Sequence, residues 1–310
     1  MKTSVVISSY NGELYILEQL KSILGQSLQP DEVLIVDDGS LDSTVEIVSN
    51  FIKDNEIEDH WKLCVNEINK GWKRNFMEAF HKVSGDIVFS CDQDDIWDKD
   101  KIKKMVKCFE DMPEIEVLTS NFAPFVKEGE SIRYLKNGLT PKTVGVSLKN
   151  YVERARANNM VLHTFVPGCT MAFRPSILQK ADMIWMPDWA HDSIISNVSK
   201  LRGTYYFLNE PLILYRRHEG TSTPKNVKTV EGRRGSSEQY LKRASIFVTN
   251  ARVLGIEESS IPLLKKIADF HTARIKFFSS SGNYFHIFPY FGYYKSLYSF
   301  LGDLYIRIKS

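Results

Sequence analysis

The chain has 310 residues, an apolar content of 43% and a formal net charge of +2. This length accommodates one α/β catalytic domain with an appendage, and the apolar content is sufficient for a full core. So small a net charge gives no global electrostatic argument for binding nucleic acid, and we expect no nucleic-acid partner. The four cysteines have no CxxC spacing, which argues against a zinc site or a disulfide framework: Cys64, Cys91, Cys108 and Cys169.

The charge is unevenly distributed along the chain. Residues 231–310 contain 12 Lys or Arg against 6 Asp or Glu, a surplus of +6, so the total of +2 leaves −4 for residues 1–230. A mildly acidic body with a basic end suggests two different partners. The first residues read as a strand and not as a signal peptide, and we find no run of about 18 uncharged apolar residues. We therefore expect a cytoplasmic protein that does not span a membrane.

The first 110 residues alternate between strand and helix patterns. Strands are expected at 3–8, 32–37, 61–66 and 86–90, and helices at 13–24, 42–51 and 72–83. Strands that are separated by helices of this length need crossover connections and hence a parallel sheet. The pattern predicts an α/β fold of the doubly wound type.

Beyond residue 115 the alternation becomes less regular. We expect strands at 116–125, 165–173, 203–208 and 212–215, a helix at 193–201, and a loop or short hairpin at 127–150. From about residue 236 the pattern is helical to the end. The fold class expected is therefore a mixed, mainly parallel sheet flanked by helices, with a helical C-terminal extension.

Two apolar runs stop abruptly on carboxylates. Residues 33–36 are followed by Asp37 and Asp38, and residues 86–90 lead to the acidic run 92–95. Open α/β sheets bind ligands beyond the carboxyl ends of such strands. The acids of the run Asp92-Gln93-Asp94-Asp95 would repel one another without a cation or hydrogen-bond donors, and a divalent metal with a bound phosphate is one solution. In an extended chain, Asp92 and Asp94 would project the same way.

Six ordered motifs resemble the inverting glycosyltransferases of family 2, with the GT-A (Rossmann-like) fold. They cover residues 1 to about 220: Val5-Val6-Ile7-Ser8-Ser9-Tyr10-Asn11-Gly12, Ile35-Val36-Asp37-Asp38-Gly39-Ser40, Asn69-Lys70-Gly71 with Asn75, Asp92-Gln93-Asp94-Asp95-Ile96-Trp97, Pro167-Gly168-Cys169-Thr170-Met171-Ala172-Phe173, and Ala190-His191-Asp192. The fourth motif is similar to that of bacterial polysaccharide rhamnosyltransferases. The resemblance implies a catalytic domain at 1–230, with nucleotide-sugar binding at 1–110 and the acceptor side at 111–230, and a helical, aromatic and basic region at 231–310.

The nucleotide end of the expected site combines polar residues from the first three strands. Asp38 ends the second strand, where its carboxylate could accept the imide N–H of uracil or thymine; the alternative is that Asp37 and Asp38 cap the next helix. Ser8 and Tyr10 end the first strand, and Ser8 is either near the base or ribose or a simple turn hydroxyl. Four residues around the start of the third helix are expected to meet the nucleotide or its phosphates, unless they are solvated: Asn69, Gly71, Arg74 and Asn75.

The diphosphate end is expected to hold Mn²⁺ or Mg²⁺. By resemblance Asp94 ligates the cation and Asp92 touches the ribose or the donor sugar, while Asp95 either ligates or bonds to nearby backbone. His218 could complete the metal or diphosphate site, whereas Arg216 and its neighbour Arg217 could be a solvated pair. Trp97 is expected to be a packing residue, with a sugar-facing ring as the alternative.

The acceptor side is expected around Asp192. In the family the general base stands at the start of a helix after a strand like 165–173, and Asp192 matches that position; a plain helix cap is the alternative. His191 is a weaker rival base on the same side. The motif residues Gly168, Cys169 and Thr170 complete this side of the site.

The last 40 residues, 271–310, contain 12 Phe or Tyr and 5 Lys or Arg against a single Asp. Aromatic rings with cationic neighbours suit the headgroup region of a membrane, so we expect peripheral contact with an anionic membrane. The alternatives are packing on the catalytic domain and a homodimer interface.

With these observations, the resemblance implies a metal-dependent, inverting sugar transferase that acts at the inner face of the cell membrane in the synthesis of a bacterial cell-surface polysaccharide. The donor expected is dTDP-rhamnose, and the acceptor a glycan, in particular a lipid-linked one. The alternatives are a UDP-hexose or UDP-N-acetylhexosamine transferase of the same fold and, in another class, a non-catalytic nucleotide-sugar-binding scaffold. Intact Asp38, Asp94 and Asp192 argue against the scaffold.

Overall fold

The computed structural model describes residues 1–129, 131–218, 229–279 and 284–309. It divides into two compact units. Unit 1 comprises Met1–Ala155, Thr164–Ser199 and Thr204–Gly220, and unit 2 comprises Arg156–His163, Lys200–Gly203 and Thr221–Ser310. The boundary predicted near residue 230 stays a prediction.

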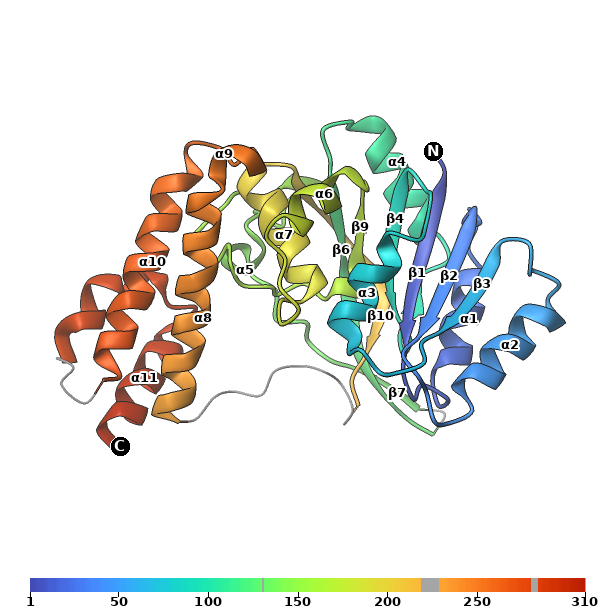
Figure 1. Cartoon of the computed structure of the whole chain (residues 1–310), viewed down its shortest axis with the longest axis horizontal. Helices are drawn as coiled ribbons and strands as arrows, with labels where there is room; N and C mark the ends of the chain where they lie inside the picture. Colours follow the sequence, from blue (N-terminus) through green and yellow to red (C-terminus); the bar gives the residue numbers. More distant parts are fainter. Residues whose placement is uncertain (130, 219–228, 280–283, 310) are drawn as a thin grey trace. The chain divides into compact units, whose positions relative to one another are not determined.

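Four parallel strands form one side of the sheet in unit 1 (Figure 1). They are β1 (Thr3–Ser9), β2 (Glu32–Asp37), β3 (Trp61–Val65) and β4 (Ile87–Asp92), in the order β3-β2-β1-β4. The helices between them are α1 (Ile16–Leu24), α2 (Thr44–Asp54) and α3 (Trp72–Phe80). Both faces of the strands are covered, since Val5, Val6 and Ile7 of β1 are all fully buried. The predicted α/β fold is confirmed.

The other side of the sheet is mixed. Its strands are β5 (Ile96–Trp97), β6 (Val117–Glu128), β7 (Ser131–Tyr134), β8 (Val152–Arg154), β9 (Met171–Phe173) and β10 (Tyr205–Arg216). β9 lies antiparallel between β4 and β6, and β10 runs parallel to β6. β6 and β7 form the hairpin that was one alternative for the start of 127–150. The remaining helices of this unit are α4 (Lys101–Asp111), α5 (Pro141–Val144), α6 (Ser176–Asp182) and most of α7 (His191–Arg202).

Two details of the predicted strands were wrong. The strand expected at 165–173 is limited to β9, because Pro167 precedes a 3₁₀ turn, η1, at Gly168–Thr170. The two strands expected at 203–208 and 212–215 are one strand, β10, whose register shifts on both sides of Pro211. Proline lacks the N–H that the ladder needs, so the pairing is irregular there while the strand continues.

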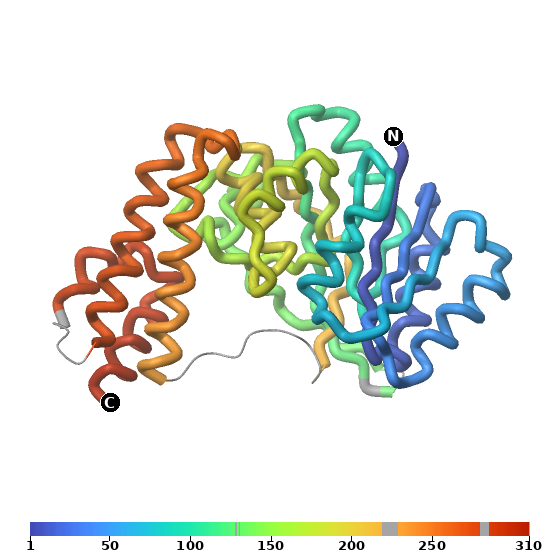
Figure 2. Tube along the Cα trace, viewed as in Figure 1, coloured from blue at the N-terminus to red at the C-terminus, as the bar shows by residue number. Residues whose placement is uncertain are grey.

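Unit 2 contains the helices of the C-terminal region. They are α8 (Val230–Thr249), α9 (Ala251–Leu254), α10 (Ser260–Phe277), the 3₁₀ segment η2 (Tyr284–Tyr293) and α11 (Leu297–Lys309). α8 and α10 run side by side (Figure 2), and α10 also packs against η2. Aromatic side chains dominate the core at this end of the unit: Phe270, Phe277, Phe278, Ile287, Tyr294 and Phe300. Among the described residues, no helix is long and apolar enough to cross a membrane.

Candidate functional site

The sheet brings the polar ends of three strands together. In the parallel register Ser9 of β1 lies beside Asp37 of β2, and Ser8 lies beside Asp92 of β4. The strand order reverses between β1 and β4, and this reversal is where open α/β sheets bind ligands. The two acidic clusters of the sequence therefore meet at one edge, as predicted.

Asp38 is buried and organises the loop that precedes α3. Its Oδ1 accepts hydrogen bonds from Asn66 Nδ2 at 2.9 Å and from the Lys70 N–H at 2.9 Å, and its Oδ2 accepts one from the Gly71 N–H at 2.8 Å. A carboxylate has about four acceptor positions, and these three bonds use three of them. The role of Asp38 in base selection stays a prediction. Asp37 supports the sheet edge instead, accepting from Ser9 Oγ at 2.7 Å.

Asn75 joins this loop to β1. Its amide donates to Ser8 Oγ at 2.8 Å and to the Val36 carbonyl at 2.9 Å, and its Oδ1 accepts from Asn66 at 2.8 Å. Asn75 is buried, whereas Ser8 is partly accessible. Ser8 is thus held at the edge of the sheet by a residue from the next motif.

The start of α3 is built on Gly71. Its φ of +82° lies in the region that favours glycine. The neighbouring Asn69 accepts from the Gly71 N–H at 3.0 Å. Arg74 pairs with Glu78 at 2.6 Å and Lys70 pairs with the same carboxylate at 2.8 Å, so a phosphate contact by Arg74 would compete with Glu78.

Gln93 clamps the end of β1 to the acidic turn. Its Oε1 accepts from the Tyr10 N–H at 2.9 Å and its Nε2 donates to the Tyr10 carbonyl at 3.0 Å, while the Tyr10 side chain is 42% exposed. A Cβ at Gly12 would lie 2.2 Å from Gln93 Oε1, so a larger residue there would displace the Gln93 amide from Tyr10. Sequence reasoning gave Gln93 no role, because a backbone contact across 83 residues leaves no local signal.

The acidic motif turns instead of continuing extended. Residues 93 and 94 form a turn, so the alternation expected for Asp92 and Asp94 was wrong. Possible ligand atoms of Asp92, Asp95 and Cys169 lie within 4.8 Å of one another. Burial, then the charges of Asp94 and Asp192, raise the pKa of Asp92 to about 7. Burial also raises the pKa of Asp95 and that of the Cys169 thiol well above their usual values.

Asp94 pairs with His218, which lies just beyond the end of β10. Asp94 Oδ2 and His218 Nε2 are 2.7 Å apart, and both side chains keep some exposure, at 17% and 22%. The imidazole packs on the Tyr15 ring with centroids 4.7 Å apart. The two residues are 124 positions apart in sequence, and the fold brings them into direct contact.

Arg216 is not part of a solvated pair, and that alternative was wrong. Its side chain is 4% exposed and lies over the rings of Tyr15 and Phe125. Its Nε donates to the Asp94 carbonyl at 2.7 Å, and its backbone N–H donates to Asp95 Oδ1 at 2.9 Å. Arg216 also bonds to Glu18 of α1. It therefore fixes the acidic turn from behind.

Lys101 places a buried cation beneath the same turn. It is 0% exposed, donates to the Cys169 carbonyl at 2.9 Å and lies 4.0 Å from the centroid of the Trp97 ring. Burial lowers its pKa to about 8, although the negative charges of nearby acids, Asp95 among them, act to raise that pKa. Trp97 is buried, which confirms that it is a packing residue.

Asp192 lies in the first turn of α7, which begins one residue before it. Its Oδ1 accepts from the Ser193 N–H at 2.7 Å, and its charge contributes to the raised pKa of Asp92. A Cβ at Gly168 would lie 2.9 Å from Asp192 Cβ, so only glycine fits beside it. Asp192 is therefore near the acidic turn, and it remains partly accessible.

His191 is in the core. It is 2% exposed, its ring packs on Phe76 with centroids 4.1 Å apart, and burial lowers its pKa to about 3. A buried neutral imidazole cannot meet an acceptor, so the structure removes support for His191 as a base. Three further residues predicted on this side are also buried and shape the backbone beneath the site: Gly168, Cys169 and Thr170.

Two groups of residues could hold a divalent cation, and the pair Asp94 and His218 fits one better than the group of Asp92, Asp95 and Cys169. Asp94 and His218 offer a carboxylate and an imidazole that remain partly exposed, a donor set that suits Mn²⁺ and, less well, Mg²⁺. The group of partly buried Asp92 with buried Asp95 and Cys169 contains a thiol whose raised pKa keeps it protonated, and a neutral sulfur is a poor ligand for these ions. The assignment of Asp94 and His218 as ligands stays a prediction.

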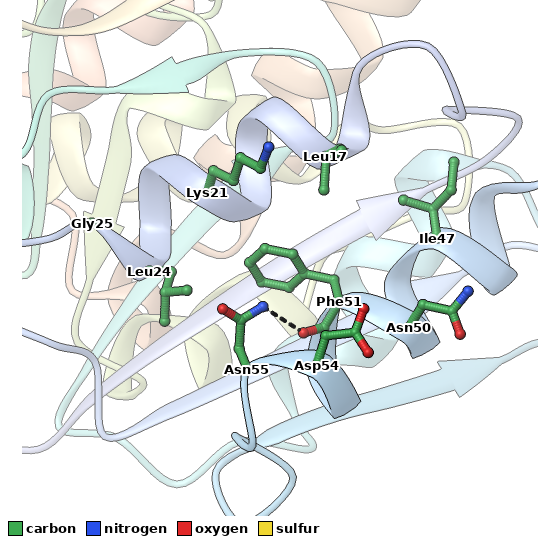
Figure 3. A pocket seen from close by; sticks show the side chains of 9 residues that line it. All are labelled: Leu17, Lys21, Leu24, Gly25, Ile47, Asn50, Phe51, Asp54 and Asn55. Carbon is green, nitrogen blue, oxygen red and sulfur yellow. Dashed lines mark hydrogen bonds between the residues drawn. The ribbon is translucent and has the colours of Figure 1, made fainter.

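A hollow of about 600 Å³ lies elsewhere in unit 1, between α1 and α2 (Figure 3). Its apolar lining consists of Leu17, Leu24, Ile47 and Phe51. Lys21 and Asp54 lie at its sides. It contains none of the residues predicted for the site, and its lining offers no group of acids or histidines that could hold a metal.

Comparisons with known proteins agree with this geometry. The family described as Glycosyl transferase family 2 matches residues 4–180, more than half of the chain. The dTDP-rhamnosyl transferase RfbG of Shigella flexneri is 27% identical over 244 residues, which are 71% of this chain and 74% of that protein.

Two kinds of solved structure share the fold. TarS of S. aureus in complex with UDP-GlcNAc has a TM-score of 0.60 at 18% identity, covering 99% of this chain and 90% of that chain. The mannosyltransferase PcManGT from Pyrobaculum calidifontis in complex with GDP-Man and Mn²⁺ has a TM-score of 0.55 at 18% identity, covering 90% and 73%. At these identities the likeness shows the fold alone.

Proposed function

The chain belongs to glycosyl transferase family 2, and we propose that it transfers a sugar from a nucleoside diphosphate to a glycan acceptor with inversion at the anomeric carbon. The observation that supports this most is that two acidic residues with different surroundings, Asp94 and Asp192, lie near the same acidic turn. Asp94 pairs with His218 at the strand ends, and Asp192 lies on a separate helix, close enough to affect the pKa of Asp92. One group can serve the leaving diphosphate and the other the attacking hydroxyl.

Asp192 is the proposed general base. The acceptor oxygen forms a bond to the anomeric carbon while the bond from that carbon to the diphosphate oxygen breaks, and the acceptor proton passes to Asp192. The nucleoside diphosphate leaves with the electron pair of the broken bond. Attack opposite the leaving group inverts the configuration.

The donor end is proposed to use the edge formed by β1, β2 and β4. Ser8 and Asp38 lie at the nucleoside end, with Asn75 positioning Ser8. Asp92 is assigned to the ribose or sugar, and Asp94 with His218 would hold Mn²⁺ or Mg²⁺. The cation, when bound, supplies positive charge that stabilises the leaving diphosphate. Arg216 keeps the acidic turn in place through the Asp94 carbonyl, and Lys101 holds the Cys169 carbonyl of the neighbouring motif.

The donor sugar is proposed to be L-rhamnose from dTDP-rhamnose. The printed name of the Shigella flexneri relative and the Asp-Gln-Asp-Asp-Ile-Trp motif support this choice. A UDP-N-acetylhexosamine or UDP-hexose is the second candidate, because TarS shares the fold over 99% of this chain and was solved with UDP-GlcNAc. The acceptor is proposed to be a lipid-linked glycan of a bacterial surface polysaccharide, modified at the cytoplasmic membrane face.

A panel of nucleotide sugars separates these proposals. With purified protein and Mn²⁺, slow hydrolysis of the donor reports sugar choice without knowledge of the acceptor. We expect dTDP-rhamnose to be hydrolysed fastest, with loss of the activity when the metal is chelated. Preference for UDP-N-acetylglucosamine would establish the second candidate. Binding of nucleotide sugars without hydrolysis or transfer to any glycan acceptor would favour a non-catalytic scaffold.

A further inference from the structure

One side of the C-terminal elements of unit 2 is apolar and exposed. On α11 the exposed residues Tyr298, Leu301, Tyr305 and Ile308 follow the spacing of one helical stripe, with exposed fractions between 46% and 86%. Phe285 and Phe288 of η2 are also exposed and contact each other at 5.8 Å, and Phe288 contacts Phe300 of α11 at 5.4 Å. We call these six exposed residues the C-terminal apolar face.

Hydrogen bonds on the opposite side of α11 fix the orientation of the helix and keep this face exposed. Asp303 is fully buried and accepts from Arg274 Nε at 2.7 Å, from Arg274 Nη2 at 3.0 Å and from the Tyr294 hydroxyl at 2.8 Å. Arg233 adds a fourth bond at 3.2 Å. The helix cannot rotate its apolar stripe inward without breaking this network. The exposure of the apolar stripe is therefore built into the unit.

The segment that carries the face exposes cationic side chains and no acid of its own. Residues 271–310 contain one acidic residue, Asp303, and the network above buries it. Lys295 and Lys309 are exposed, and Lys309 lies 5.7 Å from the centroid of the Tyr305 ring. A segment of exposed aromatic, aliphatic and cationic side chains complements an anionic lipid headgroup layer, and an exposed acid outside it, Asp269 of α10, lies beside Tyr293.

We propose that the C-terminal apolar face binds the surface of an anionic lipid bilayer, with its rings at the headgroup level and Lys295 and Lys309 on lipid phosphates. A second copy of the chain fits less well, because a two-fold interface pairs a patch with itself and would bring like charges together. The proposal rests on unit 2 alone and does not depend on the reaction proposed for unit 1. For a lipid-linked acceptor, docking would raise the effective concentration of the substrate.

Sedimentation of the full chain with vesicles tests the proposal. Vesicles of equal parts phosphatidylglycerol and phosphatidylcholine are compared with pure phosphatidylcholine. We expect binding to the anionic vesicles only, and an affinity that falls about tenfold when about 0.5 M salt replaces about 0.1 M. The double variant Tyr298→Ser with Tyr305→Ser and the double variant Lys295→Gln with Lys309→Gln should each weaken binding about tenfold or more.

The matched control is Val253→Ser, which removes an exposed apolar side chain from α9 in the same unit. It should bind vesicles like the unchanged protein, and circular dichroism should show all variants folded. The proposal is overturned if the full chain does not sediment with anionic vesicles, or if both double variants bind as well as Val253→Ser. It is equally overturned if the chain forms a stable dimer in solution that the Tyr298→Ser, Tyr305→Ser variant dissociates.

Discussion

Two buried aspartates, one in each unit, have opposite surroundings. Asp303 in unit 2 is 0% exposed and accepts four hydrogen bonds from two arginines and a tyrosine. Asp95 in unit 1 is also 0% exposed, yet its Oδ1 accepts from the Arg216 N–H while its Oδ2 accepts from no N–H or O–H group among the described residues. Burial and two neighbouring carboxylates raise the pKa of Asp95 well above its usual range.

The difference separates a structural carboxylate from one in a binding site. A fully bonded buried acid holds helices together and has no capacity left for a ligand. A crowded group of acids with unfilled acceptor positions is costly to the fold and is typical of a site that a cation or a substrate completes. We therefore expect the acids of unit 1 to serve binding and the acid of unit 2 to serve stability.

The largest expected effect comes from changing each aspartate to its neutral isostere. Asp303→Asn leaves the buried Arg274 without its charged partner, and we expect the free energy of unfolding of unit 2 to fall by about 3 to 5 kcal/mol. Asp95→Asn should leave the stability of unit 1 unchanged or higher, since its new amide can donate to nearby Asp92. Urea denaturation followed by circular dichroism measures both. Equal losses of unfolding free energy in the two variants would contradict the distinction between Asp303 and Asp95.

The variant Asp192→Asn tests whether this acid of unit 1 acts as the general base. Removing the base should lower the rate of transfer by roughly 10²-fold or more, while donor affinity is retained because the base acts on the acceptor. Single-turnover transfer and calorimetric titration with the nucleoside diphosphate measure the two quantities. A matching loss of donor affinity would place Asp192 in the donor site instead.

A smaller effect concerns acid sensitivity in unit 2. Burial, then the charge of Arg274, lowers the pKa of His271 to about 2, so the folded state keeps the ring neutral. The unfolded chain, with a pKa near 6.5, takes up a proton as the pH falls below that value, so stability present at pH 7 is lost on acidification. Between pH 7 and pH 5 the loss from this one residue is about 2 kcal/mol.

His271→Phe should therefore reduce the loss of stability between pH 7 and pH 5 by about 2 kcal/mol. The Nδ1 atom of His271 has no hydrogen-bond partner among the described residues, so the exchange breaks no bond at that atom. Denaturation curves of both proteins at the two pH values provide the measurement. An unchanged pH dependence would mean that His271 is protonated in the folded chain.

The sequence was enough to predict the first half of the fold and the approximate composition of the site. Continuous apolar runs defined β1, β2 and β4, and their ends placed Asp38, Asp92 and Asp94 at one edge. Short, local signals of this kind are what periodicity can detect.

The parts that were missed depend on contacts between distant segments. Arg216 looked solvated because nothing near it in sequence reveals that the Asp94 carbonyl, 122 residues away, accepts its hydrogen bond. Lys101 was overlooked for the same reason, since its partner is the carbonyl of Cys169. The chain also turns at Gln93 and Asp94, whereas an extended chain was predicted there, and Asp94 pairs with His218.

The acidic turn of unit 1 is proposed to bind a nucleoside diphosphate through a metal held by Asp94. Calorimetric titration of dTDP and UDP, with and without Mn²⁺, tests this directly in the unchanged protein, in Asp94→Ala and in Asp54→Ala, which alters an exposed acid on α2. We predict that Mn²⁺ strengthens binding in the unchanged protein and in Asp54→Ala, and that Asp94→Ala loses this gain. Equal Mn²⁺-dependent affinity in Asp94→Ala, or no binding of either diphosphate by the unchanged protein, would contradict the claim.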